Sequence, residues 1–223
     1  MVAQRLSIII PTLNEAPRIR ATLEPLAPLR ARGHEVIVAD GGSSDATREL
    51  AASLCDRVVA SARGRGLQMN AGARAAGGDV FLFLHADTHL PSAPDHLVEE
   101  ALKGHVWGRF DVAIDSPHPL LKVVAWSMNL RSRATGIATG DQAIFVRREA
   151  FAGFPEIALM EDIAFSKQMK RRAAPACLRA RVTTSGRRWE ARGVLRTILL
   201  MWRLRLLYFL GARPERLARL YES

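Results

Sequence analysis

Over the first ninety residues, short apolar runs alternate with longer segments of mixed polarity. The apolar runs cover residues 6–10, 35–39, 57–60 and 79–84. Runs of this length that are rich in β-branched residues are typical of strands buried in a parallel sheet. Pro11 is expected to end the first strand, and Gly33 marks the turn before the second.

The segments between these runs are expected to be helical. One helix is predicted from Pro17 to Arg32, because proline is favoured at a first helical position. A second follows Ser44 and Asp45, either of which can cap it, and a third covers residues 66–76. Alternating strands and helices predict an α/β fold, with helices on both faces of a mostly parallel sheet.

After Pro91 the pattern is less regular. Helices are predicted at residues 93–103, 120–131 and 161–172, and strands at 106–113, 143–146 and 177–182. The remainder is predicted to be helical. We expect a single domain over residues 1–223, with a mixed second half and a C-terminal helical segment from residue 191.

One apolar stretch, at residues 194–210, needs separate treatment because Arg196, Arg203 and Arg205 interrupt it. A membrane-spanning helix needs about 20 apolar residues, and arginine near its centre is costly. We expect a helix that ends at Gly211, followed by another that starts at Pro214. Core packing, a homodimer contact and a position on a membrane surface are all left open for it.

Composition narrows the possible partners. Apolar residues make up 48% of the chain, and 32 Lys and Arg against 22 Asp and Glu give a net charge of +10. Such a charge suits anionic lipid, a phosphorylated substrate or simply solvated arginines. No nucleic-acid-binding signature is present, so no nucleic acid partner is expected. Without a signal-peptide pattern at its N-terminus, the protein is expected in the cytoplasm, with a peripheral contact to the inner face of the membrane left open.

Polar residues gather where three of the predicted strands end. In a parallel sheet, ligands bind beyond the carboxyl ends of the strands. A carboxylate such as Asp40 can accept hydrogen bonds from a base or ribose there, and Gly41 and Gly42 allow close approach to the backbone. The three clusters are Thr12-Asn14-Glu15, Asp40-Ser43-Asp45 and His85-Asp87.

These blocks and their spacing resemble the opening of family 2 glycosyltransferases. The matching segments are Pro11-Thr12-Leu13-Asn14-Glu15, residues 38–47, Asn70-Ala71-Gly72 and His85-Ala86-Asp87. Three later pieces resemble a small bacterial subgroup associated with arsenosugar biosynthesis. These pieces are Gly140-Asp141-Gln142-Ala143, Glu161-Asp162 and Arg188-Trp189.

The resemblance implies a single GT-A-like domain with a Rossmann-like sheet and a nucleoside diphosphate-sugar donor, commonly a uridine diphosphate sugar. Residues 1–90 would be the nucleotide-binding half and 91–190 the acceptor and catalytic half. Asp87 would bind Mg²⁺ or Mn²⁺, although His85 replaces the first Asp of the family's Asp-x-Asp signature. The implied nucleotide-binding residues are Pro11, Thr12, Asn14, Glu15, Asp40, Ser43, Arg65, Asn70 and Asp87.

The acidic pair Glu161 and Asp162 matches the family's catalytic position, with Asp162 as the base that accepts the acceptor's proton. Direct attack on the anomeric carbon would invert its configuration. The alternative is that both acids only stabilise a helix N-terminus. The resemblance also assigns contacts with donor sugar or acceptor to Gly140, Asp141, Gln142, Arg188 and Trp189, while Trp189 could equally be a buried core residue.

Two other functions are compatible with a nucleotide-binding sheet. A nucleotidyltransferase would normally carry a glycine-rich, basic loop after the first strand, and residues 11–15 contain neither glycine nor a basic residue. A catalytically weak protein that binds nucleotide sugar or a membrane surface is the other alternative. The acceptor is left open between a small molecule and a lipid-linked one.

Overall fold

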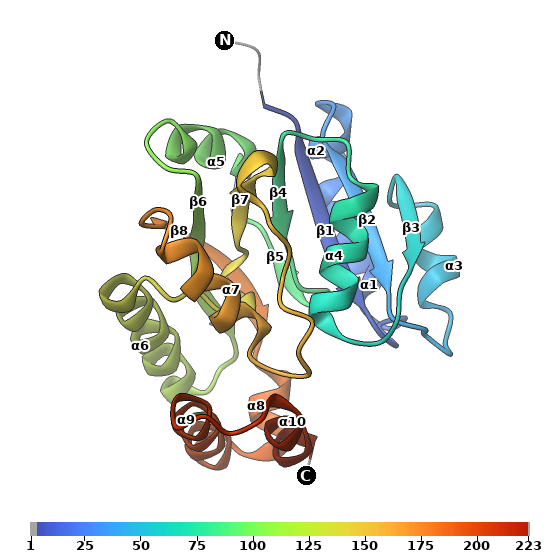
Figure 1. The fold of residues 1–223 in the computed structure, drawn as a ribbon. Coiled ribbons are helices and arrows are strands. Elements are labelled where there is room, and N and C mark those ends of the chain that lie inside the picture. Colours follow the sequence, from blue (N-terminus) through green and yellow to red (C-terminus); the bar gives the residue numbers. More distant parts are fainter. Residues whose placement is uncertain (1–3, 223) are drawn as a thin grey trace.

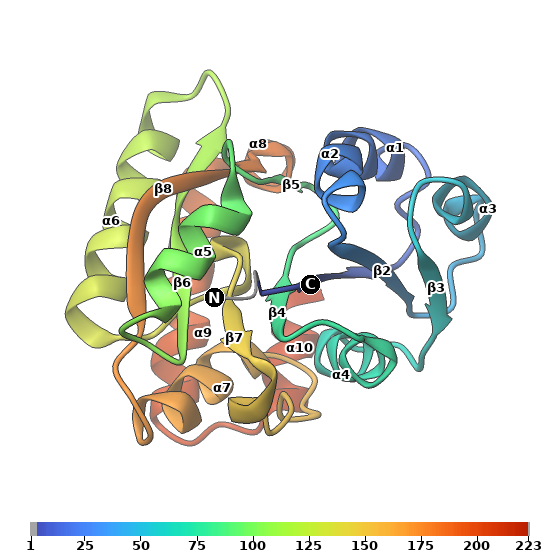
Figure 2. The ribbon, with the colours of Figure 1, turned by 90° about the horizontal axis from the view of Figure 1, so that it is seen from above.

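The computed structural model describes residues 4–222. Among these residues a single eight-stranded sheet has the order β3-β2-β1-β4-β7-β6-β8-β5 (Figures 1 and 2). Strands β1 to β4 are parallel, whereas β7 runs antiparallel between β4 and β6. The strands are β1 Leu6–Thr12, β2 Glu35–Asp40, β3 Arg57–Ala60, β4 Val80–Phe83, β5 Thr88–His89, β6 Trp107–Asp115, β7 Phe145–Arg147 and β8 Ala176–Ser185.

Helices cover both faces of this sheet, as the sequence predicts. One face packs against α1, α2, α3 and α5, and the other against α4 and α7. The α-helices are α1 Ile19–Leu23, α2 Ala27–Ala31, α3 Thr47–Ala52, α4 Arg65–Ala75, α5 Pro94–Leu102, α6 Pro119–Thr135, α7 Glu161–Lys170, α8 Arg187–Arg192, α9 Val194–Phe209 and α10 Pro214–Glu222. Three 3₁₀ turns are η1 Glu24–Leu26, η2 Gly140–Gln142 and η3 Arg148–Ala150.

Two differences from the predicted elements occur at prolines. The single helix expected from Pro17 to Arg32 is divided into α1, η1 and α2, because Pro25 and Pro28 lack the N–H groups that a continuous helix needs. Strand β1 also continues through Pro11. Its pairing with β4 stops at Ile9, while its pairing with β2 continues to Thr12.

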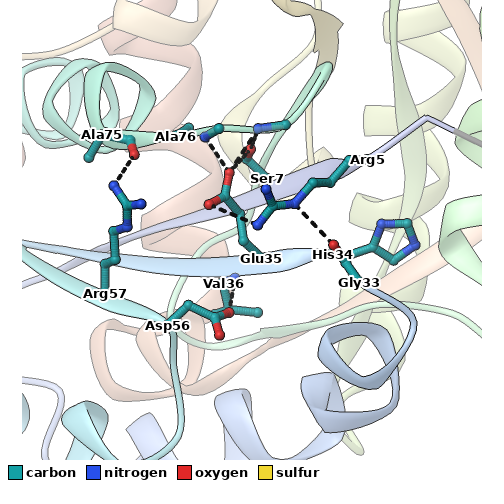
Figure 3. A network of polar contacts seen from close by, with 12 residues as sticks. Arg5, Ser7, Gly33, His34, Glu35, Val36, Asp56, Arg57, Ala75 and Ala76 are labelled. Carbon is teal, nitrogen blue, oxygen red and sulfur yellow. Dashed lines mark hydrogen bonds and ion pairs between the residues drawn. The ribbon is translucent and has the colours of Figure 1, made fainter.

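A network of polar contacts holds the amino ends of the first strands together (Figure 3). The buried Glu35 carboxylate accepts hydrogen bonds from Ser7 Oγ at 2.5 Å and from the N–H groups of Gly77 at 2.5 Å and Gly78 at 2.9 Å. Arg5 adds an ion pair at 3.6 Å. Burial raises the pKa of Glu35, but these donors outweigh it and the pKa is lowered.

The C-terminal helices match the prediction at their boundaries. Helix α9 ends just before Gly211, whose φ of +86° suits glycine, and Pro214 begins α10. The α9 residues Val194, Thr197 and Leu204 are buried, whereas Trp202 is 71% exposed. Over residues 4–222, every helix is too short or too polar to cross a bilayer.

Candidate functional site

A polar cleft of about 380 Å³ lies at the carboxyl ends of the parallel strands, as expected for this sheet. It is built from the loops after β1 and β4, the start of α4, and the C-terminal helices. The sequence-predicted residues that line it are Pro11, Thr12, Glu15, Arg65, Asp87, Asp141, Glu161, Arg188 and Trp189. Residues more than 170 positions apart in the sequence therefore meet in one cavity.

Three further predicted residues, Asn14, Asp40 and Ser43, bond to one another and lie outside this lining. The Asp40 carboxylate accepts hydrogen bonds from Gly42 N–H at 3.0 Å, Ser43 N–H at 2.9 Å and Ser43 Oγ at 2.5 Å. Asn14 has a left-handed φ of 54°, and its N–H donates to Ser43 Oγ at 2.9 Å. These hydrogen bonds hold the loops after β1 and β2 together.

Asn70 and Gln142 are also directed away from the cleft. The Asn70 amide exchanges two hydrogen bonds with the backbone of Phe154, at 2.9 and 2.7 Å. Gln142 is buried, and its Oε1 accepts a hydrogen bond from Thr139 N–H at 3.2 Å. Both side chains position loops at the site.

Gln68 is a cleft residue that the sequence analysis missed. Its Nε2 donates to the carbonyl oxygens of Thr12 at 2.7 Å and Ala39 at 3.0 Å, which ties α4 to the ends of β1 and β2. A polar residue within a helix carries no sequence signal that distinguishes such a buried role from a solvated one.

The acidic pair begins α7, immediately after Met160 in left-handed backbone with φ of 71°. Asp162 Oδ2 accepts a hydrogen bond from Gly140 N–H at 2.9 Å. A Cβ on Gly140 would collide with the His85 imidazole, so glycine is needed for this close approach. The acidic pair is thus fixed against the loop that joins α6 to β7.

Burial dominates the electrostatics of these acids. It raises the pKa of Glu161 to about 7, with the charge of Asp162 adding to the effect and that of Arg65 opposing it. Burial also raises the pKa of Asp162, although the N–H groups of Gly140 and Ile163 oppose it. A carboxylate whose pKa is raised toward neutrality can exchange protons at physiological pH.

The pKa values of two more acids in the cleft are shifted in opposite directions. Burial, and then the charge of Asp87, raise the pKa of Glu15. Burial would also raise the pKa of Asp141, but the hydrogen bond from His85 Nδ1 at 3.2 Å leads the effects that lower it. Asp141 is therefore held as an anion beside His85.

An apolar groove of about 560 Å³ adjoins the polar cleft between α6, α7 and α9. Arg65, Asp141, Glu161, Arg188 and Trp189 line both cavities, and Asp162 lines the groove. The half-buried Trp189 also packs against the small core formed by α6 and α9, so it contributes to packing and at the same time lines both cavities. The acidic pair consequently lies where a polar cavity and an apolar cavity meet.

The C-terminal helix α10 closes one side of the cleft through Tyr221. The Arg188 guanidinium donates to the Tyr221 hydroxyl, and Arg192 donates to the Tyr221 carbonyl oxygen at 2.6 Å. Both guanidinium groups also lie over the tyrosine ring, at 5.5 and 5.4 Å from its centre. Arg188 is thereby oriented at the cleft.

The side chains present suit a metal that is shared with a substrate. Within residues 4–222, no three His, Cys, Asp or Glu side chains are grouped to hold a cation by themselves. Asp87 lines the cleft, and the hydrogen bond recorded for its carboxylate, from Thr88 Oγ1, is long at 3.5 Å. Mg²⁺ is commonly held by one or two carboxylates together with substrate phosphates and water, so Asp87 fits such an ion.

Comparison with known proteins agrees with this architecture. Residues 7–160 match the family model described as Glycosyl transferase family 2. The succinoglycan biosynthesis protein ExoA of Rhizobium meliloti is 39% identical over 105 residues, which cover 43% of this chain and 32% of ExoA. A PGL/p-HBAD biosynthesis glycosyltransferase of Mycobacterium bovis is 37% identical over 100 residues, covering 42% of this chain and 39% of that protein. The chain thus spans well under half the length of these relatives.

Solved structures share the fold. S. aureus TarS residues 1–349, in complex with UDP-GlcNAc, has a TM-score of 0.66 at 20% identity and covers 81% of this chain and 58% of that one. Glucosyl-3-phosphoglycerate synthase of Mycobacterium tuberculosis, with Mn²⁺, uridine diphosphate and glucosyl-3-phosphoglycerate, has a TM-score of 0.56 at 20% identity and covers 81% and 71%. The sheet of this chain is therefore that of a GT-A-like domain, as predicted. Because the family model covers more than half of the sequence, this chain belongs to glycosyl transferase family 2.

Proposed function

We propose that this enzyme transfers a sugar from a uridine diphosphate sugar to an acceptor hydroxyl, with inversion at the anomeric carbon and with the help of a divalent metal. The observation that carries the proposal is the acidic pair at the junction of the two cavities, with Glu161 buried, Asp162 half-buried and the pKa of each raised. The polar cleft would take the donor, and the apolar groove would take the acceptor.

Donor binding is supported by the arginines of the polar cleft. Arg65 and Arg188 line it, and guanidinium groups match the geometry of phosphate oxygens. The bound nucleotides of the structural neighbours TarS and glucosyl-3-phosphoglycerate synthase favour uridine diphosphate as the first donor to test. Asn14, Asp40, Ser43 and Asn70 are proposed to support the nucleotide site by holding its loops.

In the proposed reaction, Asp162 accepts the proton of the acceptor hydroxyl as its oxygen attacks the anomeric carbon. The bond from that carbon to the diphosphate oxygen breaks, and the nucleoside diphosphate leaves with the electron pair. Inversion follows from a single displacement. Glu161 lies next to Asp162 and has a pKa of about 7. We propose that Glu161 holds a proton at lower pH and that its protonation state influences the ionisation of Asp162.

A divalent metal would be held by Asp87 and by the donor's phosphate oxygens. When bound, Mg²⁺ or Mn²⁺ stabilises the negative charge that develops on the departing diphosphate. Arg65 and Arg188 act on the same charge from the protein side. The proposal draws support from the Mn²⁺ in the glucosyl-3-phosphoglycerate synthase complex.

Membership of the family favours sugar transfer over nucleotidyl transfer. The assignment to the subgroup associated with arsenosugar biosynthesis rests on the motifs around residues 140–143, 161–162 and 188–189, and it stays a proposal. That subgroup favours a small-molecule acceptor, whereas the apolar groove favours a lipid-linked one. The cytoplasmic location and the homodimer are likewise predictions still to be tested.

Calorimetric titration with uridine diphosphate, with and without Mn²⁺, tests the donor and metal sites together. We expect Mn²⁺-dependent binding in the wild type and loss of the Mn²⁺ dependence in Asp87→Ala. Arg74→Gln, an exposed change on α4 outside the cleft lining, is the control. If Asp87→Ala binds uridine diphosphate as tightly as the wild type in the presence of Mn²⁺, Asp87 is not the metal ligand. If the wild type does not bind uridine diphosphate, uridine diphosphate is not the leaving group.

A further inference from the structure

Large apolar side chains are exposed on two neighbouring helices, α6 and α9. Figure 1 shows these helices next to each other, on the side of the molecule away from β3 and α3. Their buried sides meet in a small shared core, which fixes one helix against the other. The exposed residues, between 38% and 74% accessible, are Leu120, Val123, Trp126, Leu130, Leu195, Leu199, Trp202, Leu206 and Phe209, with Leu210 directly after α9.

On α9 these residues form a continuous stripe. The positions recur at intervals of three or four residues from Leu195 to Phe209, which places them on one face of the helix. Arg196 and Arg203 are exposed beside the stripe. The mixed apolar and basic pattern noted in the sequence is therefore an exposed surface, and the opposite side of α9 supplies the core packing.

The charges of this surface have one sign. Neither α6 nor α9 contains an Asp or Glu residue, while Lys122, Arg196 and Arg203 are exposed on them. The remaining exposed cation of α6, Arg133, is paired with Asp111 at 2.6 Å. Two copies of this face brought together would oppose like charges, which disfavours a homodimer here. An anionic bilayer complements both the charge and the apolar stripe, and exposed Trp126 and Trp202 are of the type found at membrane interfaces.

A second cavity, of about 840 Å³, opens at the end of the same face. Phe209 belongs both to its lining and to the exposed stripe of α9. Five basic residues and no acidic residue are among the described residues that line it. The basic residues are Arg131, Lys167, Lys170, Arg171 and Arg205.

The guanidinium group of Arg131 indicates which kind of ligand this cavity would bind. All three guanidinium nitrogens are buried, and none has a hydrogen-bond partner among the described residues. Burial lowers the pKa of Arg131, which reflects the cost of this position. The charges of Asp162 and Asp141 oppose this cost, but neither carboxylate forms a hydrogen bond with the guanidinium. A buried guanidinium without a hydrogen-bond partner is unfavourable, so an anionic ligand with several oxygen atoms would stabilise it.

We propose that α6 and α9 form a docking face for an anionic lipid bilayer, with a phosphate-bearing lipid headgroup in the basic cavity beside Arg131. The helices would lie in the interface, with the stripe from Leu195 to Phe209 in contact with the acyl chains. The apolar groove between α6 and α9 leads from this face to Asp162. The docked enzyme would therefore receive a lipid-linked acceptor. This extension rests on the proposed function, whereas the docking proposal does not.

Co-sedimentation with vesicles tests the proposal on the full chain. We expect binding to vesicles that contain one third phosphatidylglycerol in phosphatidylcholine, and little binding to phosphatidylcholine alone. Arg203→Gln should weaken binding about fivefold, the effect of one basic residue near an anionic surface. Arg74→Gln on α4 removes an equal charge outside this face and should change nothing.

Two further variants separate the stripe from the headgroup site. Leu199→Ser with Leu206→Ser removes exposed side chains that line neither cavity, and should reduce vesicle binding more than tenfold without changing the melting temperature. Arg131→Gln should weaken binding to anionic vesicles by more than the exposed Arg203→Gln does. Equal effects of the two arginine variants would overturn the headgroup site.

The controls distinguish failure of docking from failure of the proposed function. Binding of uridine diphosphate by the Leu199→Ser, Leu206→Ser variant should be unchanged, because neither residue lines the cleft. Wild-type protein that ignores anionic vesicles but binds uridine diphosphate would overturn docking alone. A dimer in solution that this double variant dissociates would assign the face to a second copy and overturn docking too.

Discussion

Buried acids, Glu35 and Glu161, lie at opposite ends of the same sheet, and their surroundings differ in kind. At the amino ends of the strands, Glu35 accepts three hydrogen bonds and pairs with Arg5, so its pKa is lowered despite burial. At the carboxyl ends, the buried Glu161 lies beside the half-buried Asp162, and the pKa values of both are raised.

Glu35 and Glu161 are both buried, and they differ in the hydrogen-bond donors and charges that surround them. Glu35 belongs to a network whose donors have been matched to its charge, which is the arrangement of a structural element. Glu161 has a neighbour of like charge and one opposing arginine, Arg65, beside a cavity open to a ligand. Burial combined with few hydrogen-bond donors therefore distinguishes the candidate site from the opposite end of the sheet.

The largest expected effect comes from removing the proposed base. Asp162→Asn keeps the side-chain shape and can still accept the hydrogen bond from Gly140, but it cannot take a proton. We expect the transfer rate to fall about 10²- to 10⁴-fold, with uridine diphosphate affinity unchanged. A steady-state transfer assay and calorimetry measure the two quantities, and a rate within twofold of wild type would refute the role of Asp162.

The pH dependence of stability should sharpen the comparison. A raised pKa means that the folded protein holds the Glu161 proton more tightly than the unfolded chain, so the associated stability is present below pH 4.5 and is lost as the pH rises to about 7. The loss is at most about 3 kcal/mol. Glu161→Gln should remove this decline in urea unfolding at pH 4.5, 6 and 8, and an unchanged decline would contradict the raised pKa.

At the other end of the sheet, Glu35→Gln should cost about 1–3 kcal/mol of unfolding free energy at pH 7, because it disrupts hydrogen bonds to a charged, buried group. The change of unfolding free energy with pH is expected to be opposite in sign to the change expected for Glu161. Since the folded pKa of Glu35 is lowered, its contribution is present above pH 4.5 and is lost as the pH falls below that value. Urea unfolding at pH 7 and pH 3 measures this, and the transfer rate of the folded variant should match wild type. A variant as stable as wild type at pH 7 would show that the network is not structural.

Sequence reasoning was most accurate where periodicity or a motif carries the information. Strand β3 has the predicted bounds, and α4 and β4 lie within a residue or two of theirs. The helix from Pro17 to Arg32 was wrong because Pro25 and Pro28 interrupt it, and β5 was missed because a two-residue strand has no period. Local pattern thus determined most elements, and proline and tertiary pairing determined the exceptions.

The candidate site was harder to read from sequence. Motifs identified the cleft-lining Thr12, Asp87 and Glu161, but they gave no indication that Asn70 bonds to a distant loop. Arg131 was not singled out, because its significance lies in the absence of a partner, and that depends on how α6, α7 and α9 pack. Contacts between distant segments are a property of the folded chain that a linear motif does not encode.

The left-handed backbone around the cleft has a consequence for engineering this protein. Asn14, Ala143 and Met160 have φ values of 54°, 44° and 71°, and each adjoins a loop of the site. Non-glycine residues in this region are strained, and the surrounding structure must hold them there. Glycine at position 160 would relieve that strain while loosening the acidic pair that follows. Variants selected for heat resistance at these positions would therefore be expected to trade turnover for robustness.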